Sequence, residues 1–377
     1  LMLSVGGRWL DEEKNACMTV SGYPVNPLQT ILGLPPGSVA NTDVAGYNKT
    51  LDSYPFLTGG ALAAGSWGEN CPDWASSVYD PSFDGSASFD DFTPRVSAQY
   101  GFDNGMAYVT YSEGFRSGGF NGRASAPDNT GPYDPESVKS WEAGAKFTMF
   151  DNKFQLNLAA FTVKYEDKQE DIVKPGEDGQ ATLTIVENAS SATMEGLEMD
   201  FTWIIAEGLS LRGNVGLLDA SYDDFLTSSA TGMVDKSSIE LRRAPDMTAG
   251  LGLLFERPLA AGHWFVASVN YTWKDDYYIS APANADHSTA GYIDNPSKVD
   301  AFGLLDASIN WETENFTVSL FGKNLTDETY LMSFLDVGAN VVAAGPNDTT
   351  PVYAPGSWSF GTPNRPRYFG VEVQLKF

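Results

Sequence analysis

Along much of the chain, apolar and polar residues alternate with a period of two. The final segment shows the pattern without a break: Phe369, Val371, Val373, Leu375 and Phe377 alternate with Gly370, Glu372, Gln374 and Lys376. Because successive side chains of a β-strand point to opposite faces, this segment predicts a strand with one apolar and one polar face. The terminal aromatic, Phe377, suits the outer surface of a membrane barrel, where aromatic side chains lie at the membrane interface.

The same alternation predicts about twelve strands in the whole chain. They cover residues 1–9, 94–100, 106–115, 141–149, 154–160, 197–203, 209–217, 247–255, 265–273, 305–311, 316–320 and 369–377. Twelve is an even number, as single-chain bacterial membrane barrels require. The predicted fold class is therefore all-β, a transmembrane antiparallel β-barrel.

Long and short connections alternate strictly between these strands. Long loops are predicted at about residues 13–90, 117–137, 167–180, 223–243, 275–299 and 327–366. The short turns then all lie at one end of the sheet and the long loops at the other. Outer-membrane barrels have this asymmetry, with short periplasmic turns and longer extracellular loops.

Aromatic residues accompany both ends of the predicted strands. Beside the short turns stand Phe102, Phe150, Phe154, Trp203, Phe255, Trp264, Trp311 and Phe316. Toward the loops stand Tyr111, Tyr165, Tyr222, Trp273 and Tyr330. We interpret the two sets as aromatic girdles at the two membrane interfaces.

A soluble β-propeller or repeat sandwich is the alternative, since its strands also alternate. It does not explain the alternation of long and short connections, and it needs a fixed repeat period that this sequence lacks. The polar partners in the strands favour a hydrated barrel lumen: Glu142, Lys146, Glu198, Asp200, Arg212, Asp306, Lys323 and Glu372.

Charge and composition narrow the function classes further. The chain has 377 residues and a formal net charge of −26, from 49 acidic and 23 basic residues. Binding to nucleic acid is excluded on this basis, because phosphate contacts need clustered Lys and Arg. The charge also disfavours docking on anionic lipid. No segment approaches the roughly 18 to 20 apolar residues of a membrane helix.

The two cysteines, Cys17 and Cys71, lie in a loop-like stretch without metal-ligand spacing. A disulfide closing a long loop is the predicted use, which indicates an oxidising compartment. The N-terminus lacks the basic and apolar regions of a signal peptide and already reads as a strand. We therefore expect the chain to be the C-terminal part of something longer.

Several motifs carry a family resemblance. The run from Tyr108 to Asn121, YVTYSEGFRSGGFN, resembles the strand-to-loop signature of TonB-dependent outer-membrane receptors. Similar stretches are SWEAGAK at 140–146, NASSATMEGLE at 188–198, GKNLTDETY at 322–330, GGRWLDEEK at 6–14 and the closing strand with Phe377. The resemblance covers nearly the whole chain and keeps the motifs in order.

The resemblance implies a barrel of 22 strands, of which residues 1–377 supply the C-terminal twelve or so as one partial barrel domain. A barrel of twelve strands that stands alone is the alternative. The resemblance also implies an N-terminal plug and a short segment that contacts the TonB complex, both preceding this sequence. Further implied partners are outer-membrane lipid, the barrel-assembly machinery with Phe377 as its signal, and a small-molecule nutrient. The implied location is the bacterial outer membrane.

Catalytic chemistry is not indicated. The two histidines, His263 in a short turn and His287 in a loop, lie at opposite ends of the barrel, so they form neither a metal pair nor a triad. The glycine pair Gly118–Gly119 lacks the strand-to-helix setting of a phosphate loop. We expect no metal, no cofactor and no enzymatic activity.

Candidate ligand-binding residues are aromatic and Arg side chains of the outer loops, suited to stacking on flat ligands and to guanidinium hydrogen bonds. They are Trp67, Trp74, Tyr79, Arg116, Arg123, Tyr133, Tyr277, Tyr278 and Trp358. For any one of them, packing between loops is the simpler interpretation. Gly114, Gly118 and Gly119 are predicted to shape the strand exit.

The functional hypothesis that follows is a receptor that takes up a scarce nutrient. An iron–siderophore complex is the family's commonest cargo, with carbohydrate or cobalamin as variants. The first loop is acidic, which favours a neutral or cationic ligand or one bound through a divalent ion. The alternatives are a passive pore or surface-binding barrel, and a soluble all-β binding protein.

Overall fold

The computed structural model describes residues 1–18, 83–122, 124, 130–174, 183–229, 232–280, 297–337, 341–343, 351–353 and 358–376. Within these residues the chain is almost entirely β-structure, with one short 3-10 helix, η4 (Ala260–Gly262). Of the helical segments described, none has the length and apolar character to cross a membrane.

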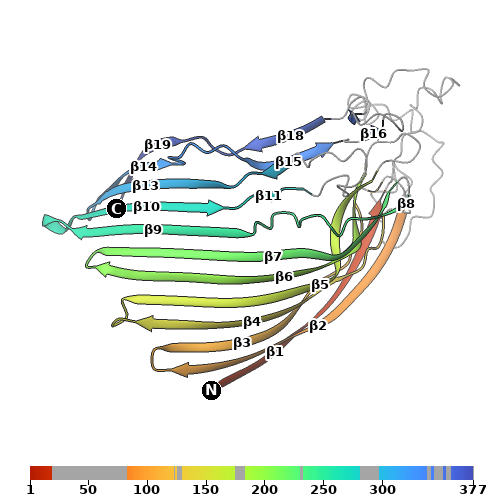
Figure 1. Cartoon of the computed structure of the whole chain (residues 1–377), viewed down its shortest axis with the longest axis horizontal. Coiled ribbons are helices and arrows are strands. Elements are labelled where there is room, and N and C mark those ends of the chain that lie inside the picture. Colours follow the sequence, from red (N-terminus) through yellow and green to blue (C-terminus); the bar gives the residue numbers. More distant parts are fainter. Residues whose placement is uncertain are drawn as a thin grey trace.

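One antiparallel sheet contains twelve strands in sequence order (Figure 1). They are β1 (Met2–Met18), β2 (Phe83–Phe102), β3 (Gly105–Arg116), β4 (Glu136–Met149), β5 (Phe154–Lys174), β6 (Leu183–Ala206), β7 (Leu209–Ser229), β9 (Met247–Pro258), β10 (Trp264–Lys274), β13 (Phe302–Glu312), β14 (Phe316–Lys323) and β19 (Tyr368–Leu375). β8 (Gly232–Asp235) adds to β7. All twelve predicted strands are confirmed in number and order.

Three small two-stranded sheets lie in the long connections. They pair β11 (Tyr277–Tyr278) with β12 (Lys298–Val299), β15 (Leu331–Val337) with β18 (Trp358–Pro363), and β16 (Val341–Ala343) with β17 (Pro351–Tyr353). Each belongs to a segment between main-sheet strands, so the loops carry structure of their own.

Short turns and long connections gather at opposite ends of the sheet, as the rhythm of connections predicts (Figure 1). In the short turn between β6 and β7, a glycine makes the tight reversal of the chain possible. Gly208 has φ 74°, and a Cβ there would collide with the carbonyl oxygen of Glu256. Only glycine fits this left-handed position beside a neighbouring strand.

The apolar side chains of successive strands share one face of the sheet. Ala160 pairs with Ala143 on one side and Leu197 on the other, and Leu197 pairs in turn with Leu217. Leu197 is 56% exposed, and on the last strand Val371 is 67% exposed. Large side chains exposed in continuous rows fit a face that contacts lipid, as predicted for the apolar faces of the strands.

The opposite face carries polar pairs that link neighbouring strands. Tyr108 Oη donates to Glu142 Oε1 at 2.6 Å, and Asn157 Nδ2 donates to Asp200 Oδ1 at 2.8 Å. Such cross-strand pairs suit the water-filled interior that the sequence predicts.

Several strands extend beyond their predicted ends into the predicted loops. β1 continues to Met18, β5 to Lys174 and β7 to Ser229, while β6 begins at Leu183. The predicted loop boundaries near residues 13, 167 and 223 were therefore too early. Backbone pairing continues beyond the apolar band, where the strict apolar–polar alternation stops.

Aromatic side chains meet across strands beside the short turns. Phe154 and Trp203 have ring centroids 6.4 Å apart, and Trp311 and Phe316 are 5.4 Å apart. These contacts fit the predicted turn-side girdle. Tyr222, assigned to the other girdle, is instead buried on the inward face, at 6% exposure.

Candidate ligand-binding site

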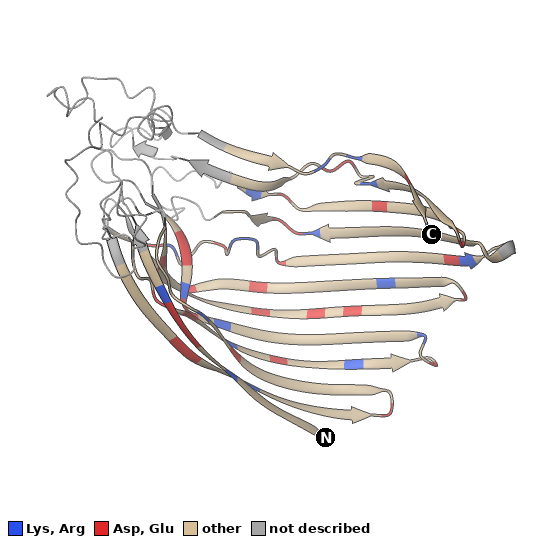
Figure 2. Ribbon diagram, turned by 180° about the vertical axis from the view of Figure 1, so that it is seen from behind, with Lys and Arg blue, Asp and Glu red and all other residues tan. Residues whose placement is uncertain are grey.

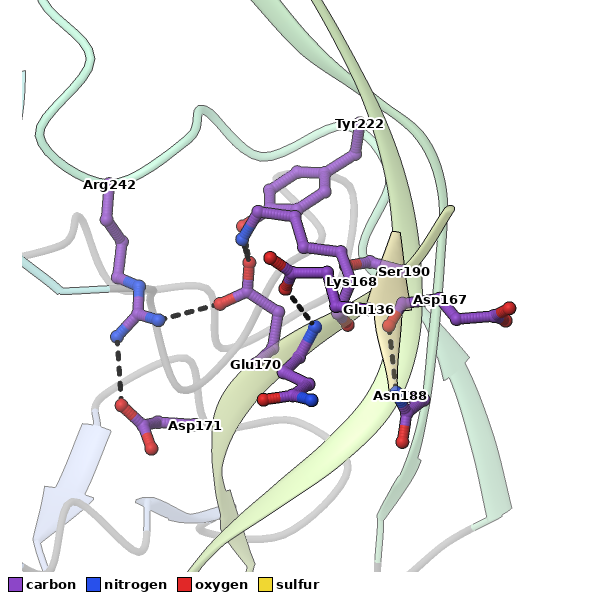
Figure 3. Close-up of polar contacts among 10 residues, drawn as sticks. Glu136, Asp167, Lys168, Glu170, Asp171, Asn188, Ser190, Tyr222 and Arg242 are labelled. Carbon is purple, nitrogen blue, oxygen red and sulfur yellow. Dashed lines mark hydrogen bonds and ion pairs between the residues drawn. The ribbon is translucent and has the colours of Figure 1, made fainter. Parts of the chain in front are cut away.

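Strands β5 and β6 bend where they leave the apolar band. Their register shifts between Tyr165 and Lys168 and again between Lys168 and Gln169, and Asp167 has φ 54°. An extra residue in one strand bends the pair and increases its twist. Lys168 and Glu170 are thereby directed toward β7 and the connection that follows β8 (Figure 3).

Glu170 is the centre of a buried polar network, here called the Glu170 network, formed with Lys168, Tyr222, Arg242 and Asp171 (Figure 3). The Glu170 side chain is 1% exposed. Arg242 Nη2 lies 2.7 Å from its Oε2, Tyr222 Oη donates to its Oε1 at 2.8 Å, and Lys168 Nζ also pairs with Oε1. Each carboxylate oxygen therefore has a charged or hydroxyl donor.

Burial alone would raise the pKa of Glu170, because it disfavours the charged carboxylate. The charge and hydrogen bond of Lys168, the hydroxyl of Tyr222 and the charge of Arg242 outweigh burial, so the pKa lies below its ordinary value. Burial and the neighbouring carboxylate raise the pKa of Tyr222. The network therefore holds a carboxylate anion and a neutral phenol at neutral pH.

An apolar cluster surrounds the ring of Tyr222. It comprises Ile172, Ala192, Tyr222, Phe225, Ile239 and Leu241. Ile239 and Leu241 belong to the connection between β8 and β9, which also carries Arg242. The connection is thus held against β5, β6 and β7 by apolar packing and by the Glu170 network together.

A second set of contacts fixes the connection between β3 and β4. Gly119 and Tyr133 exchange backbone hydrogen bonds of 3.1 and 2.8 Å. Asn121 Nδ2 donates to the carbonyl of Val186 at 3.1 Å, and its Oδ1 accepts from the Val186 N–H at 2.8 Å. The predicted strand-exit role of Gly118 is supported, since a Cβ there would meet the Tyr133 carbonyl and the Phe89 ring.

Gln169 and Asn188 extend these contacts to the bend of β5 and β6. Gln169 Nε2 donates to the carbonyls of Ser117 and Asp134, at 3.0 Å each. Asn188 Nδ2 donates to the Asp134 and Asp167 carbonyls at 2.8 Å, the second of which Figure 3 shows. The connection after β3 is therefore tied to the β5–β6 hairpin through amide side chains.

Four of the nine predicted ligand-binding residues have described side chains. Arg116 is exposed at the end of β3, and Tyr133 lies across from Gly119 in the same connection. Tyr277 and Tyr278 form β11, with Lys274 Nζ 5.4 Å from the Tyr277 ring centroid and Lys298 Nζ 5.6 Å from that of Tyr278.

Of the other five predicted ligand-binding residues, no side chain is described. Trp67, Trp74, Tyr79 and Arg123 lie outside the described residues, as do Cys71, His287 and Phe377, and only the backbone of Trp358, in β18, is described. Cys17 faces Asp84 in the β1–β2 register, and its pairing with Cys71 stays a prediction.

The surroundings of β11 join aromatic rings to cations. The Tyr278 carbonyl accepts from the backbone N–H of Arg243 at 2.8 Å, and Lys298 pairs with Asp276 at 2.9 Å. Burial raises the pKa of Tyr277; the nearby Tyr330 adds to this and Arg243 opposes it. Tyr330 stacks on Phe302 with centroids 3.9 Å apart. Rings and cations together suit flat or anionic ligands.

Acidic residues gather where the first two strands meet the long connections. Figure 2 shows acidic residues at the loop side of β1 and β2. These strands carry Asp11, Glu12, Glu13, Asp90 and Asp91 within paired segments. Across the described residues, no set of three or more His, Cys, Asp or Glu side chains has metal-binding geometry.

Sequence reasoning missed the Glu170 network, which the prediction assigned to a charged loop. No signal for it was visible in the sequence, because Lys168 to Asp171 are all polar and the alternation that marks a strand is lost there. Arg242 gave no signal either, because its partner is 72 positions away.

Comparison with known proteins shows which family this chain resembles. A family model described as "TonB dependent receptor-like, beta-barrel" matches residues 37–325. The pesticin receptor of Yersinia enterocolitica is 25% identical over 264 residues, covering 69% of this chain and 35% of that receptor. The chain therefore spans about a third of the length of this curated relative.

Solved structures share the fold. The ferric yersiniabactin uptake receptor of Yersinia pestis superposes with a TM-score of 0.59 at 19% identity, covering 78% of this chain and 38% of that one. A siderophore receptor of Acinetobacter baumannii gives a TM-score of 0.54 at 16% identity, covering 79% and 37%. The similarity confirms the predicted barrel fold.

Proposed function

Since this chain belongs to the TonB-dependent receptor-like β-barrel family, we propose that it forms part of an outer-membrane receptor that imports a ferric siderophore complex. The family places the chain in the bacterial outer membrane and excludes the soluble alternative. Energy for import would come from the TonB complex, through a segment outside these residues.

The observation that carries the siderophore proposal is the grouping of tyrosine and basic side chains around β11. Tyr277 and Tyr278 each lie beside a lysine, and the charge of Arg243 also acts on Tyr277. Rings and cations complement ligands that present flat or anionic surfaces. Two structural relatives, an uptake receptor for ferric yersiniabactin and a siderophore receptor, also support this cargo.

Uptake by a strain that lacks the gene tests the proposal. The strain should lose uptake of iron-55 supplied as one class of ferric siderophore, and the full-length gene should restore it. Because a receptor driven through TonB needs the proton gradient, a protonophore should stop uptake, whereas a passive pore would continue to conduct. Normal growth of the strain under iron limitation would contradict the proposal, and a defect limited to cobalamin or glycans would redirect it.

Variants of β11 test whether this strand contacts the siderophore. Replacement of Tyr277 and Tyr278 by Ala should weaken siderophore binding about tenfold, or about 1.4 kcal/mol. Tyr100, 61% exposed on the lipid-facing side, serves as the control, and Tyr100→Ala should bind normally. Equal siderophore affinities of the double variant and the control would show that β11 is not part of the binding site.

A further inference from the structure

Arg242 and Arg243, two consecutive residues of the connection between β8 and β9, bind two different parts of the molecule. The Arg242 side chain lies against Glu170 of β5, with Nη2 2.7 Å from Oε2 (Figure 3). The backbone N–H of Arg243 donates to the carbonyl of Tyr278 in β11 at 2.8 Å. These two residues therefore join the Glu170 network to the strand proposed to contact the siderophore.

The backbone between these two contacts is constrained. Arg243 has φ 57°, a left-handed conformation that residues with a Cβ rarely adopt. Such a conformation persists where the surrounding contacts enforce it. Loss of the contact between Arg242 and Glu170 should therefore let Arg243 relax to an ordinary φ. Its N–H would then point away from the carbonyl of Tyr278.

The residues before Arg242 lie against β7. Glu240 forms an isolated antiparallel bridge with this strand. Ile239 and Leu241 are buried in the apolar cluster. The bridge and the cluster hold the connection up to Leu241, while Arg242 carries the attachment across to β5. Arg243 follows directly, so its backbone position depends on that last attachment.

β11 is a short strand that needs support from outside its own sheet. Its two residues, Tyr277 and Tyr278, pair with Val299 and Lys298 of β12 in a two-stranded sheet separate from the main sheet. A two-stranded pair is only marginally stable by itself. The bond from Arg243 therefore ties this small sheet to the connection that packs on β5, β6 and β7.

The same connection supplies charge to β11 and β12. Burial raises the pKa of Tyr277, and the charge of Arg243 opposes this rise. The bond to Asp276 raises the pKa of Lys298, and the charge of Glu240 adds to this effect. A movement of the connection would therefore change both the position and the electrostatic surroundings of the two tyrosines.

We propose that Arg242 is a positioning residue of the β11 site. By its contact with Glu170 it holds Arg243 in the left-handed conformation. Arg243 in turn keeps its N–H on the Tyr278 carbonyl and its charge near Tyr277. This role rests on the proposed function of β11 as a siderophore-binding strand. Without the contact, β11 would occupy its binding arrangement for less of the time, and the apparent affinity falls with that fraction.

Hydrogen exchange of the purified full-length receptor, without siderophore, tests the positioning. Arg242→Met should speed exchange at residues 277–280 about tenfold, because local opening is easier where a contact is lost. Arg242→Lys restores a cation beside Glu170 and should fall between the two. Arg257→Met is the control, since Arg257 is exposed at the turn end of β9. Wild-type exchange in Arg242→Met would overturn the proposal.

Variants of Arg243 test the backbone contact separately. Arg243→Gly keeps the N–H and adopts a left-handed φ without strain, so exchange at residues 277–280 should stay at the wild-type level. Arg243→Pro has no N–H and a fixed negative φ, so it should reproduce the faster exchange of Arg242→Met. Wild-type exchange in Arg243→Pro would also overturn the proposal.

Binding measurements show whether the positioning reaches the site. The probes are the iron-55 complexes of one catecholate, one phenolate and one hydroxamate siderophore, and variants are compared on the complex that the wild type binds most tightly. Arg242→Met should weaken this affinity about fivefold. In the background of Tyr277→Ala with Tyr278→Ala it should cause no further loss, because its effect runs through β11. A further loss of the same size there would overturn the positioning role.

Exchange and binding together distinguish this role from the proposed function. If the wild type binds none of the three complexes, or if Tyr277→Ala with Tyr278→Ala binds as the wild type does, the siderophore site at β11 fails. Exchange at residues 277–280 then still decides whether Arg242 positions β11. If the tyrosine variant binds weakly and Arg242→Met binds normally, the siderophore site stands and the positioning role is overturned.

Discussion

Arg242 Nη2 lies 2.7 Å from Glu170 Oε2, so the connection after β8 is held by a carboxylate of β5 that is 1% exposed. Lys168 and Tyr222 occupy the other carboxylate oxygen. This contact joins two segments that are 72 positions apart in the sequence. It fixes the position of the connection on the inward side of β5 and β7.

Replacing Arg242 by Met should release this connection. The change removes one partner of a buried pair and leaves the carboxylate partly uncompensated, which costs about 3 to 5 kcal/mol in comparable pairs. Hydrogen exchange should show faster exchange at residues 236–246, with the main sheet unchanged.

The control for this prediction is an exposed ion pair. Lys139 Nζ lies 2.9 Å from Glu166 Oε2, with both side chains more than two-fifths exposed. Glu166→Gln should leave exchange in the connection at the wild-type level, because exposed pairs contribute little. Unchanged exchange in Arg242→Met would show that the apolar cluster alone holds the segment.

Acid should release the same connection. The pKa of Glu170 is lower in the folded protein than its unfolded value of about 4.3. The carboxylate therefore contributes stability that is complete above the unfolded pKa and is lost as the pH falls through the folded pKa. Protection factors at residues 236–246 should be constant from about pH 8 to pH 5 and fall below about pH 4.

Glu170→Gln distinguishes this effect from general acid unfolding. The amide cannot titrate, so protection of the connection should be weaker at neutral pH and should lose the step at low pH. If Glu170→Gln lost protection at low pH by the same amount, the loss would belong to other carboxylates.

The barrel itself was predictable because lipid imposes a strict pattern. Strands such as β13 and β14 must place apolar residues outward and polar residues inward, and that alternation is visible without any structure. The same rule would have corrected the girdle assignment of Tyr222. It lies an odd number of positions from the outward-facing Leu217, so the period of two places it on the inward face.

The site was much less predictable. Glu170 and Arg242 meet because two bulges bend β5 and β6, and bulge positions leave no reliable mark in one sequence. Tyr277 and Tyr278 were predicted as ligand-binding aromatics of an outer loop. The contact of Tyr278 with Lys298 depends on the β11–β12 register, which the sequence does not show. Composition indicates which residue types bind, but not which of them come together.

The motif around Gly118 has a steric requirement that mutation can test. Gly118→Ala should displace the connection between β3 and β4, because the added methyl would meet the Tyr133 carbonyl and the Phe89 ring. Gly122→Ala is the matched control, since nothing lies within 4 Å of a Cβ there. Limited proteolysis should cleave the first variant in residues 117–135 and spare the second. Equal resistance would show that the connection adjusts at no cost.

The last prediction concerns Asn324, which lies in the motif at residues 322–330 and is 6% exposed. Its Nδ2 donates to the carbonyls of Glu328 and Arg365, at 2.8 and 3.1 Å, and its Oδ1 accepts from the Glu328 N–H at 2.9 Å. The residue has φ 51°, a left-handed conformation that Asn tolerates better than most residues.

Asn324→Ala should destabilise this turn by about 2 to 4 kcal/mol, since it leaves buried backbone groups unpaired and strains the left-handed position. Asn324→Asp keeps the bond from the Glu328 N–H and tolerates the same φ, but it cannot donate to the two carbonyls. It should therefore fall between wild type and Ala. Hydrogen exchange of the Glu328 amide measures the order directly. Protection of that amide in Asn324→Ala equal to wild type would mean that the turn is held by the backbone and by Asp306, whose Oδ1 accepts from the Asn324 N–H at 2.9 Å.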